Sequence, residues 1–82
     1  MKSVSNDDEI SMDDKIYTAN DLFEQKCTAR PTLKSKTKYL ATINQIFEQD
    51  SSYFFQITYD DSKDKVLTSI DLIRLLFKKT FY

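Results

Sequence analysis

The stretch from Tyr53 to Tyr59 (YFFQITY) decides the fold class. It is rich in aromatic and β-branched residues, which favour strands because they pack well on a pleated surface. Side chains alternate along a strand, so Tyr53, Phe55 and Ile57 fall on one face. The next residues, DDS at 60–62, are typical of a turn. We therefore predict a strand that ends at a turn and turns its Phe55 face to the core.

Strand signals continue on both sides of this stretch. Residues 39–47 (YLATINQIF) predict a second strand, in which Ile46 needs a bulge to rejoin the face of Ile43. Short segments at 26–30 and 65–68 predict two more strands. The basic segment 32–38, which lies between the strands at 26–30 and 39–47, predicts a loop. Residues 69–77 (SIDLIRLLF) fit either a helical turn or a closing strand. Several short strands separated by turns favour a small all-β barrel. The predicted core comprises Ala41, Ile43, Ile46, Tyr53, Phe55, Ile57, Val66, Leu72 and Leu75.

The N-terminal residues differ in composition from the rest of the chain. Residues 1–14 contain five acidic residues and one basic residue, whereas the remainder contains eight acidic and 11 basic ones. A polar, acidic segment buries too little apolar surface to offset the entropy lost on ordering. We therefore expect a disordered acidic leader at 1–15, a folded domain at 16–77 and a short tail at 78–82. Near the start of the folded domain, Thr18 or Asn20 is expected to cap a short helical turn.

The composition excludes many functions. The chain has no His, no Gly and one Cys, so the zinc sites built on Cys and His and the Gly-rich phosphate loops are excluded. A His-based catalytic triad is excluded as well. We expect no enzyme activity and no cofactor. Cys27 is expected to be a small buried residue in a reduced compartment. The sequence shows no signal peptide and no apolar stretch of the ~20 residues that span a membrane, so no membrane partner is expected.

The order of four segments resembles a Tudor domain over roughly residues 22–76. The segments are KCTAR (26–30), KYLATINQI (38–46), FQITYDD (55–61) and VLTSIDLIRL (66–75). The first half is similar to the survival-motor-neuron type, and the later segments are similar to the Tudor modules of DNA-damage checkpoint mediators. The resemblance implies a five-stranded SH3-like barrel without catalysis, in a nuclear protein of chromatin or DNA repair. It also implies a monomer or one part of a tandem module.

The resemblance further implies an aromatic cage for methylated lysine or arginine in a histone or another methylated protein. The matching positions are Tyr39, Tyr59 and Asp61. The remaining wall positions fall on or near Pro31 and near Lys63, neither of which is aromatic. A methylated ammonium is still cationic, so aromatic faces attract it by ~0.5–2 kcal/mol each. A carboxylate can also accept a hydrogen bond from any N–H that remains.

Three alternatives stay open at this point. Tyr39 and Tyr59 can be purely structural aromatics at the end of the barrel, with Asp61 serving the turn. A basic patch can bind DNA or RNA phosphates without sequence preference, in a strongly salt-dependent way; its candidate residues are Lys26, Arg30, Lys34, Lys36 and Lys38. Finally, exposed aromatic residues such as Phe54 can bind an unmodified protein.

Overall fold

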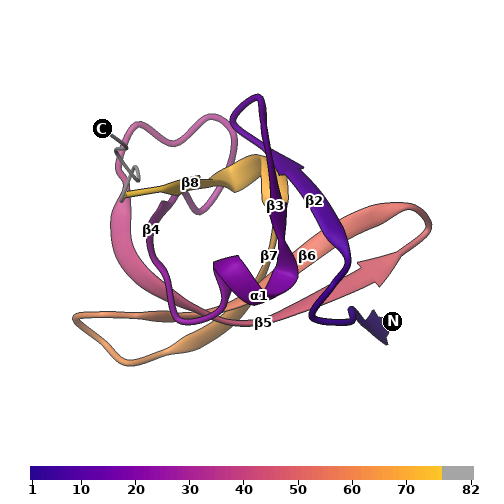
Figure 1. Cartoon of the computed structure of the whole chain (residues 1–82). Coiled ribbons are helices and arrows are strands. Elements are labelled where there is room, and N and C mark those ends of the chain that lie inside the picture. The colour runs from indigo at the N-terminus through magenta and orange to yellow at the C-terminus, as the bar shows by residue number, and fades with distance from the viewer. Residues whose placement is uncertain (77–82) are drawn as a thin grey trace, which may run out of the picture.

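The structure, a computed structural model, describes residues 1–76 and consists almost entirely of antiparallel strands (Figure 1). The main sheet has the order β7-β6-β5-β4-β8, with β1 added to β5, and β2 and β3 form a separate two-stranded sheet. The strands are β1 (Lys2–Ser3), β2 (Glu9–Met12), β3 (Lys15–Thr18), β4 (Lys26–Ala29), β5 (Tyr39–Gln49), β6 (Ser52–Tyr59), β7 (Lys65–Ser69) and β8 (Ile73–Leu75). The predicted all-β class is confirmed.

The hairpin of β5 and β6 lies inside the main sheet, between β7 and β4. Its register shifts between Ile43 and Gln45, which is the bulge that the sequence required before Ile46. Ile43 and Ile46 consequently both lie in the core, at 0% and 2% exposure. The turn uses Asp50 and Ser51 with φ of 53° and 66°, a left-handed pair that suits the right-handed twist of a hairpin.

The core forms around the face of β6 that the sequence indicated. Five of the nine predicted core residues are fully buried: Ala41, Ile43, Ile46, Phe55 and Ile57. The other four, Tyr53, Val66, Leu72 and Leu75, are partly buried, and all of them except Leu72 pack against the core. Cys27 is buried, as expected. On the other face of the hairpin, Phe47 and Phe54 are direct cross-strand partners and are partly buried.

The first 15 residues correct the prediction of a disordered leader. They contain β2 and the start of β3, which pair from Glu9↔Thr18 to Met12↔Lys15. Ile10 and Met12 are 0% and 4% exposed and join the core. The average composition of the segment hid this alternation of two apolar residues. Its charged residues are all exposed, in the turn of the hairpin and outside it, so water continues to solvate them.

The hairpin leads into α1 (Ala19–Leu22), a single helical turn. Thr18 is its N-cap: its hydroxyl accepts a hydrogen bond from the backbone N–H of Asp21 at 3.3 Å, which confirms the capping prediction. Ala19 and Leu22 are buried, so this turn covers one side of the core. Neither helix in residues 1–76 is long and apolar enough to cross a membrane.

The segment after β7 combines the two structures that its sequence allowed. Ile70–Leu72 forms a 3-10 turn, η1, whose N-cap Ser69 accepts a hydrogen bond from the N–H of Asp71. Ile73–Leu75 then pairs with β4 as β8. Within residues 1–76, β7 and β8 are the two ends of the main sheet and do not pair with each other. Phe77 and the predicted tail at 78–82 lie outside the described residues.

Candidate functional site

Two tyrosines from neighbouring strands face each other at one end of the sheet. Tyr39 begins β5 and Tyr59 ends β6, and the register pairs Tyr59 with Ala41, two residues after Tyr39. This diagonal offset places residues of the same face within reach of aromatic side chains. The ring centroids are 5.8 Å apart and the ring planes make an angle of 74°. Tyr39 is 45% exposed, so much of its surface is accessible to a ligand.

The two rings line a cavity of about 330 Å³, whose remaining lining comes from β5, the loop before it and the turn between β6 and β7. The lining residues are Pro31, Tyr39, Leu40, Tyr59, Asp61, Ser62 and Asp64. All three predicted cage residues therefore meet in one place. Pro31 also lines the cavity, and the family resemblance had placed a wall position on or near it. Lys63 does not line the cavity, and Asp64 takes part in its place.

The turn between β6 and β7 brings two acidic residues, Asp61 and Asp64, to the lining of the cavity. The backbone N–H of Tyr59 donates to the carbonyl of Asp64, and the N–H of Lys63 donates to the carbonyl of Tyr59, both at 2.9 Å. Lys63 adopts φ of 64° to complete the turn. Asp61 and Asp64 are exposed, and neither forms an ion pair with another side chain of residues 1–76. They are available to a cationic ligand.

Asp60 differs from these two acids because it is already engaged. The ammonium of Lys26 lies 3.0 and 3.1 Å from its two carboxylate oxygens, and the hydroxyl of Thr42 donates to it at 3.4 Å. The sequence analysis placed Lys26 in a basic patch together with Arg30, Lys34, Lys36 and Lys38. Lys26 lies in β4, where its charge is compensated by Asp60.

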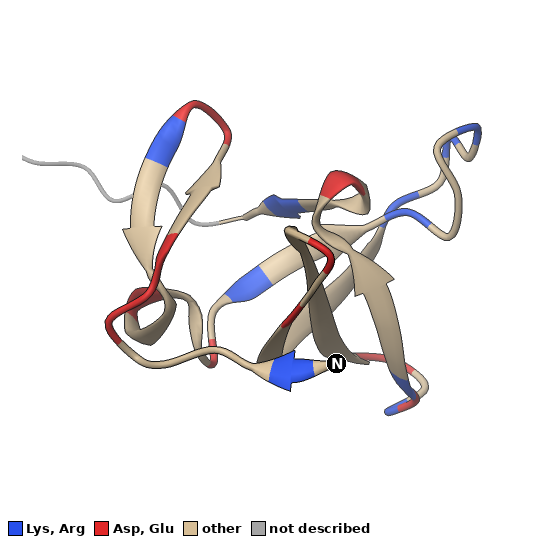
Figure 2. Ribbon diagram, turned by 90° about the vertical axis from the view of Figure 1, so that its right-hand side faces the viewer, with Lys and Arg blue, Asp and Glu red and all other residues tan. Residues whose placement is uncertain are grey.

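The other residues of the predicted patch lie in or beside the loop between β4 and β5 (Figure 2). Lys34, Lys36 and Lys38 are exposed, whereas Arg30 is partly buried and its backbone N–H donates to the carbonyl of Leu72. In the view of Figure 2 this loop projects on the side away from the acidic turn of the β2–β3 hairpin. Because Pro31 and Tyr39 both line the cavity, the basic loop begins and ends beside it.

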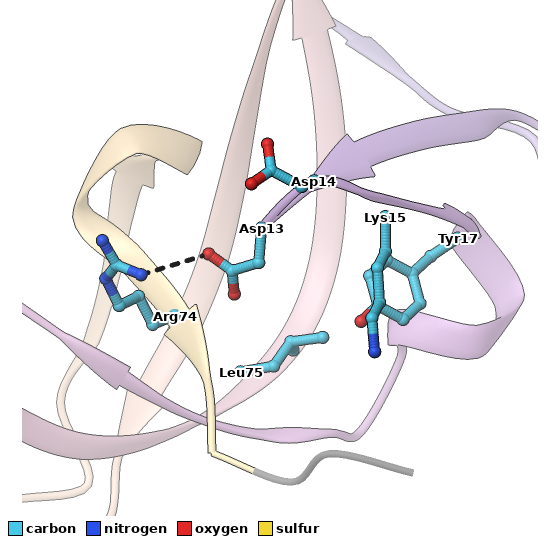
Figure 3. Close-up of a pocket in the computed structure, with 6 residues that line it drawn as sticks. All are labelled: Asp13, Asp14, Lys15, Tyr17, Arg74 and Leu75. Atoms are coloured by element: carbon cyan, nitrogen blue, oxygen red, sulfur yellow. Dashed lines mark hydrogen bonds and ion pairs between the residues drawn. The ribbon is translucent and has the colours of Figure 1, made fainter. Parts of the chain in front are cut away.

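A second cavity of about 520 Å³ lies between the β2–β3 hairpin and β8 (Figure 3). Its lining residues are Asp13, Asp14, Lys15, Tyr17, Arg74 and Leu75. Asp13 and Arg74 point toward each other across it and form an ion pair of 3.4 Å. It has one aromatic wall and as many basic as acidic side chains. It is therefore less suited to a single charged ligand than the tyrosine cavity.

Sequence reasoning missed Asp64 as a member of the site. The family pattern pointed to Lys63, one residue away, and the left-handed φ of Lys63 reverses the chain at that point. The acidic turn composition of DDSKD (60–64) was the available signal. Within residues 1–76, no group of three or more Cys, Asp or Glu residues is placed to hold a metal ion. Comparison with protein-family models, curated proteins and solved structures gives no match to this chain.

Proposed function

We propose that the chain is a non-catalytic binding module that takes a methylated lysine or arginine side chain into the cavity between Tyr39 and Tyr59. The observation that carries this proposal is the pair of ring planes at 74°, beside Asp61 and Asp64, which form no ion pair within residues 1–76. Both rings line the same cavity, where a weakly hydrated cation would be attracted to the aromatic electrons. The carboxylates add charge complementarity.

The balance of aromatic and acidic groups favours a low degree of methylation. Two tyrosine walls contribute ~0.5–2 kcal/mol each to the binding of a cation. Asp61 and Asp64 can accept charge-assisted hydrogen bonds from a monomethyl or dimethyl ammonium, which keeps at least one N–H. A trimethyl ammonium has no N–H and loses that contribution. The preferred ligand is thus a monomethylated or dimethylated lysine, with methylated arginine as a related candidate.

The order of the strands supports a Tudor-type interpretation of the fold. The four strands β4 to β7 follow one another as antiparallel neighbours, a 3-10 turn comes next, and β8 returns to pair with β4. We propose that this arrangement is an SH3-like barrel, to which the β2–β3 hairpin and α1 are added. A Tudor-type module fits a nuclear protein of chromatin or DNA repair that recognises a methylated histone or another methylated protein.

The test is an amide NMR titration with peptides that differ in one lysine, unmodified or carrying one to three methyl groups. We expect methylation-dependent shifts at Tyr39, Tyr59, Asp61 and Asp64, and weaker binding of the trimethylated form. Tyr59→Ala should reduce affinity about tenfold or more. The variant loses one aromatic wall and also the ring that packs against Tyr39. Tyr59→Phe retains the ring face and should stay within about threefold of the wild type.

The control variant is Leu67→Ser, which changes a residue that is 50% exposed and does not line the cavity. It should bind as the wild type does. Equal binding of methylated and unmodified peptides, or unchanged binding by a folded Tyr59→Ala variant, would refute the cage.

A second candidate function is binding of a nucleic-acid backbone by the loop between β4 and β5. Lys34, Lys36 and Lys38 favour it, since all are exposed and none is in an ion pair within residues 1–76. Such binding should weaken steeply with added salt. It should survive Tyr59→Ala and be lost when the three lysines are changed to Glu. A salt-independent interaction would exclude this function.

A further inference from the structure

The turn that carries Asp61, Ser62 and Asp64 is joined to β4 and β5 through one residue, Asp60. Within residues 1–76, the hydrogen bonds and ion pairs that join residues 60–64 to β4 or β5 all meet at Asp60. Its N–H donates to the carbonyl of Leu40 at 3.0 Å, and its carboxylate receives Lys26 and Thr42. The other bonds of the turn are internal or return to Tyr59.

From this arrangement we infer that Lys26 is a positioning residue for the tyrosine cavity. It does not line the cavity and acts through Asp60. Its ammonium contacts both carboxylate oxygens of Asp60, 34 positions away in the sequence, and ties the start of β4 to the end of β6. That contact holds the chain immediately after Tyr59 and immediately before Asp61. The choice of ligand rests on the proposed function. The effect of Lys26 on the position of the turn can be measured without a ligand.

The Lys26–Asp60 ion pair also gives Asp60 a different role from those of Asp61 and Asp64. Lys26 neutralises Asp60, whose side chain is 27% exposed, and leaves Asp61 and Asp64 free for a ligand. Without Lys26, an uncompensated Asp60 would be repelled by the other acids of the turn and lose its attachment to β4. An electrostatic effect alone would strengthen cation binding in that variant, because the site becomes more negative. A positioning effect would weaken it. The sign of the change therefore distinguishes the two roles.

The experiment measures binding of a dimethyl-lysine peptide by the whole chain and by Lys26→Met. We expect about a two- to fivefold loss of affinity, the range that one partly exposed ion pair can supply. The charge-swapped double variant, Lys26→Asp with Asp60→Lys, restores the pair and should recover affinity to within about twofold. Arg74→Met is the matched control, because it removes the Asp13 ion pair at the other cavity and should leave affinity unchanged.

A second readout needs no ligand. In Lys26→Met the amide signals of Asp61, Ser62 and Asp64 should shift, and in Arg74→Met they should not. Unchanged or tighter binding by a folded Lys26→Met variant, or failure of the swap to recover affinity, would overturn the inference. If the wild type binds no methylated peptide, the proposed function fails. Unshifted turn signals in Lys26→Met would then overturn the positioning role separately.

Discussion

Tyr39 and Tyr59 meet edge to face, with ring centroids 5.8 Å apart, although they lie at opposite ends of the β5–β6 hairpin in sequence order. Aromatic pairs in this geometry contribute about 0.5–1.5 kcal/mol beyond the area that they bury. The pair is thus partly structural, which was one of the alternatives open from the sequence. Its exposure at the cavity leaves the same rings accessible to a cation, so the two roles are compatible.

The two free carboxylates should contribute separately to cation binding. Asp61→Asn and Asp64→Asn keep the size of each side chain and remove its charge. We expect about a three- to tenfold loss of affinity for a dimethyl-lysine peptide in each variant, because a charge-assisted hydrogen bond or an attractive charge is removed. Isothermal titration calorimetry measures this change. Asp71→Asn, an exposed acid of η1 outside this cavity, should bind normally. Equal losses in all three variants would indicate a general charge effect.

The β2–β3 hairpin should contribute to stability through Ile10. Ile10→Ala removes a fully buried side chain, and such truncations cost about 2–5 kcal/mol in the free energy of unfolding. Ile16→Ala is the matched control, since Ile16 lies in the same hairpin and is 69% exposed; it should change stability by less than about 0.5 kcal/mol. Urea unfolding measures both variants. Equal, small effects would mean that the N-terminal residues do not pack on the core.

The turn of the β5–β6 hairpin should tolerate glycine at one position and not at the next. Ser51 has φ of 66°, a region that is unfavourable for residues with a Cβ and accessible to glycine. Ser51→Gly should raise the free energy of unfolding by about 0.5–1 kcal/mol. Ser52→Gly, at the first position of β6, should lower it by a similar amount because glycine weakens strands. Thermal melts that show the opposite order would contradict this turn geometry.

Stability should fall in alkaline solution partly because of Cys27. Burial, followed by the charge of Asp60, raises the pKa of the Cys27 thiol from 9.0 to about 11, against an opposing effect of Lys26. Between these two values the unfolded chain releases the thiol proton while the folded protein retains it. The free energy of unfolding therefore decreases as the pH rises through this interval.

Urea unfolding across that pH range measures the effect, and Cys27→Ala is the comparison. The variant should be less stable than the wild type at neutral pH, because it leaves a small void. It should lose less stability as the pH rises, since only the wild type has the buried thiol whose pKa is raised. Parallel pH curves for the two proteins would exclude a contribution from Cys27.

Much of the main sheet was predictable from the sequence. The alternation in 53–59 predicted β6. The segment 39–47 predicted β5, and the irregular spacing of Ile43 and Ile46 predicted the bulge between these two residues. Tyr39, Tyr59 and Asp61 were also identified as a group, and the structure brings them to one cavity. These features follow from side-chain periodicity and turn composition, which act over a few residues and can be read locally.

Other features depend on contacts between residues far apart in the sequence. Ile10 and Met12 are buried because the β2–β3 hairpin packs against the core. The composition of residues 1–15 could not indicate this packing. Asp64 lines the cavity because the chain reverses at Lys63, and the charge of Lys26 in β4 is compensated because Asp60 lies beside it. Local alternation was enough to predict β5 and β6 and the inward face of each strand. Which acids stay free, and which end of the core the N-terminal hairpin covers, depended on contacts between residues far apart in the chain.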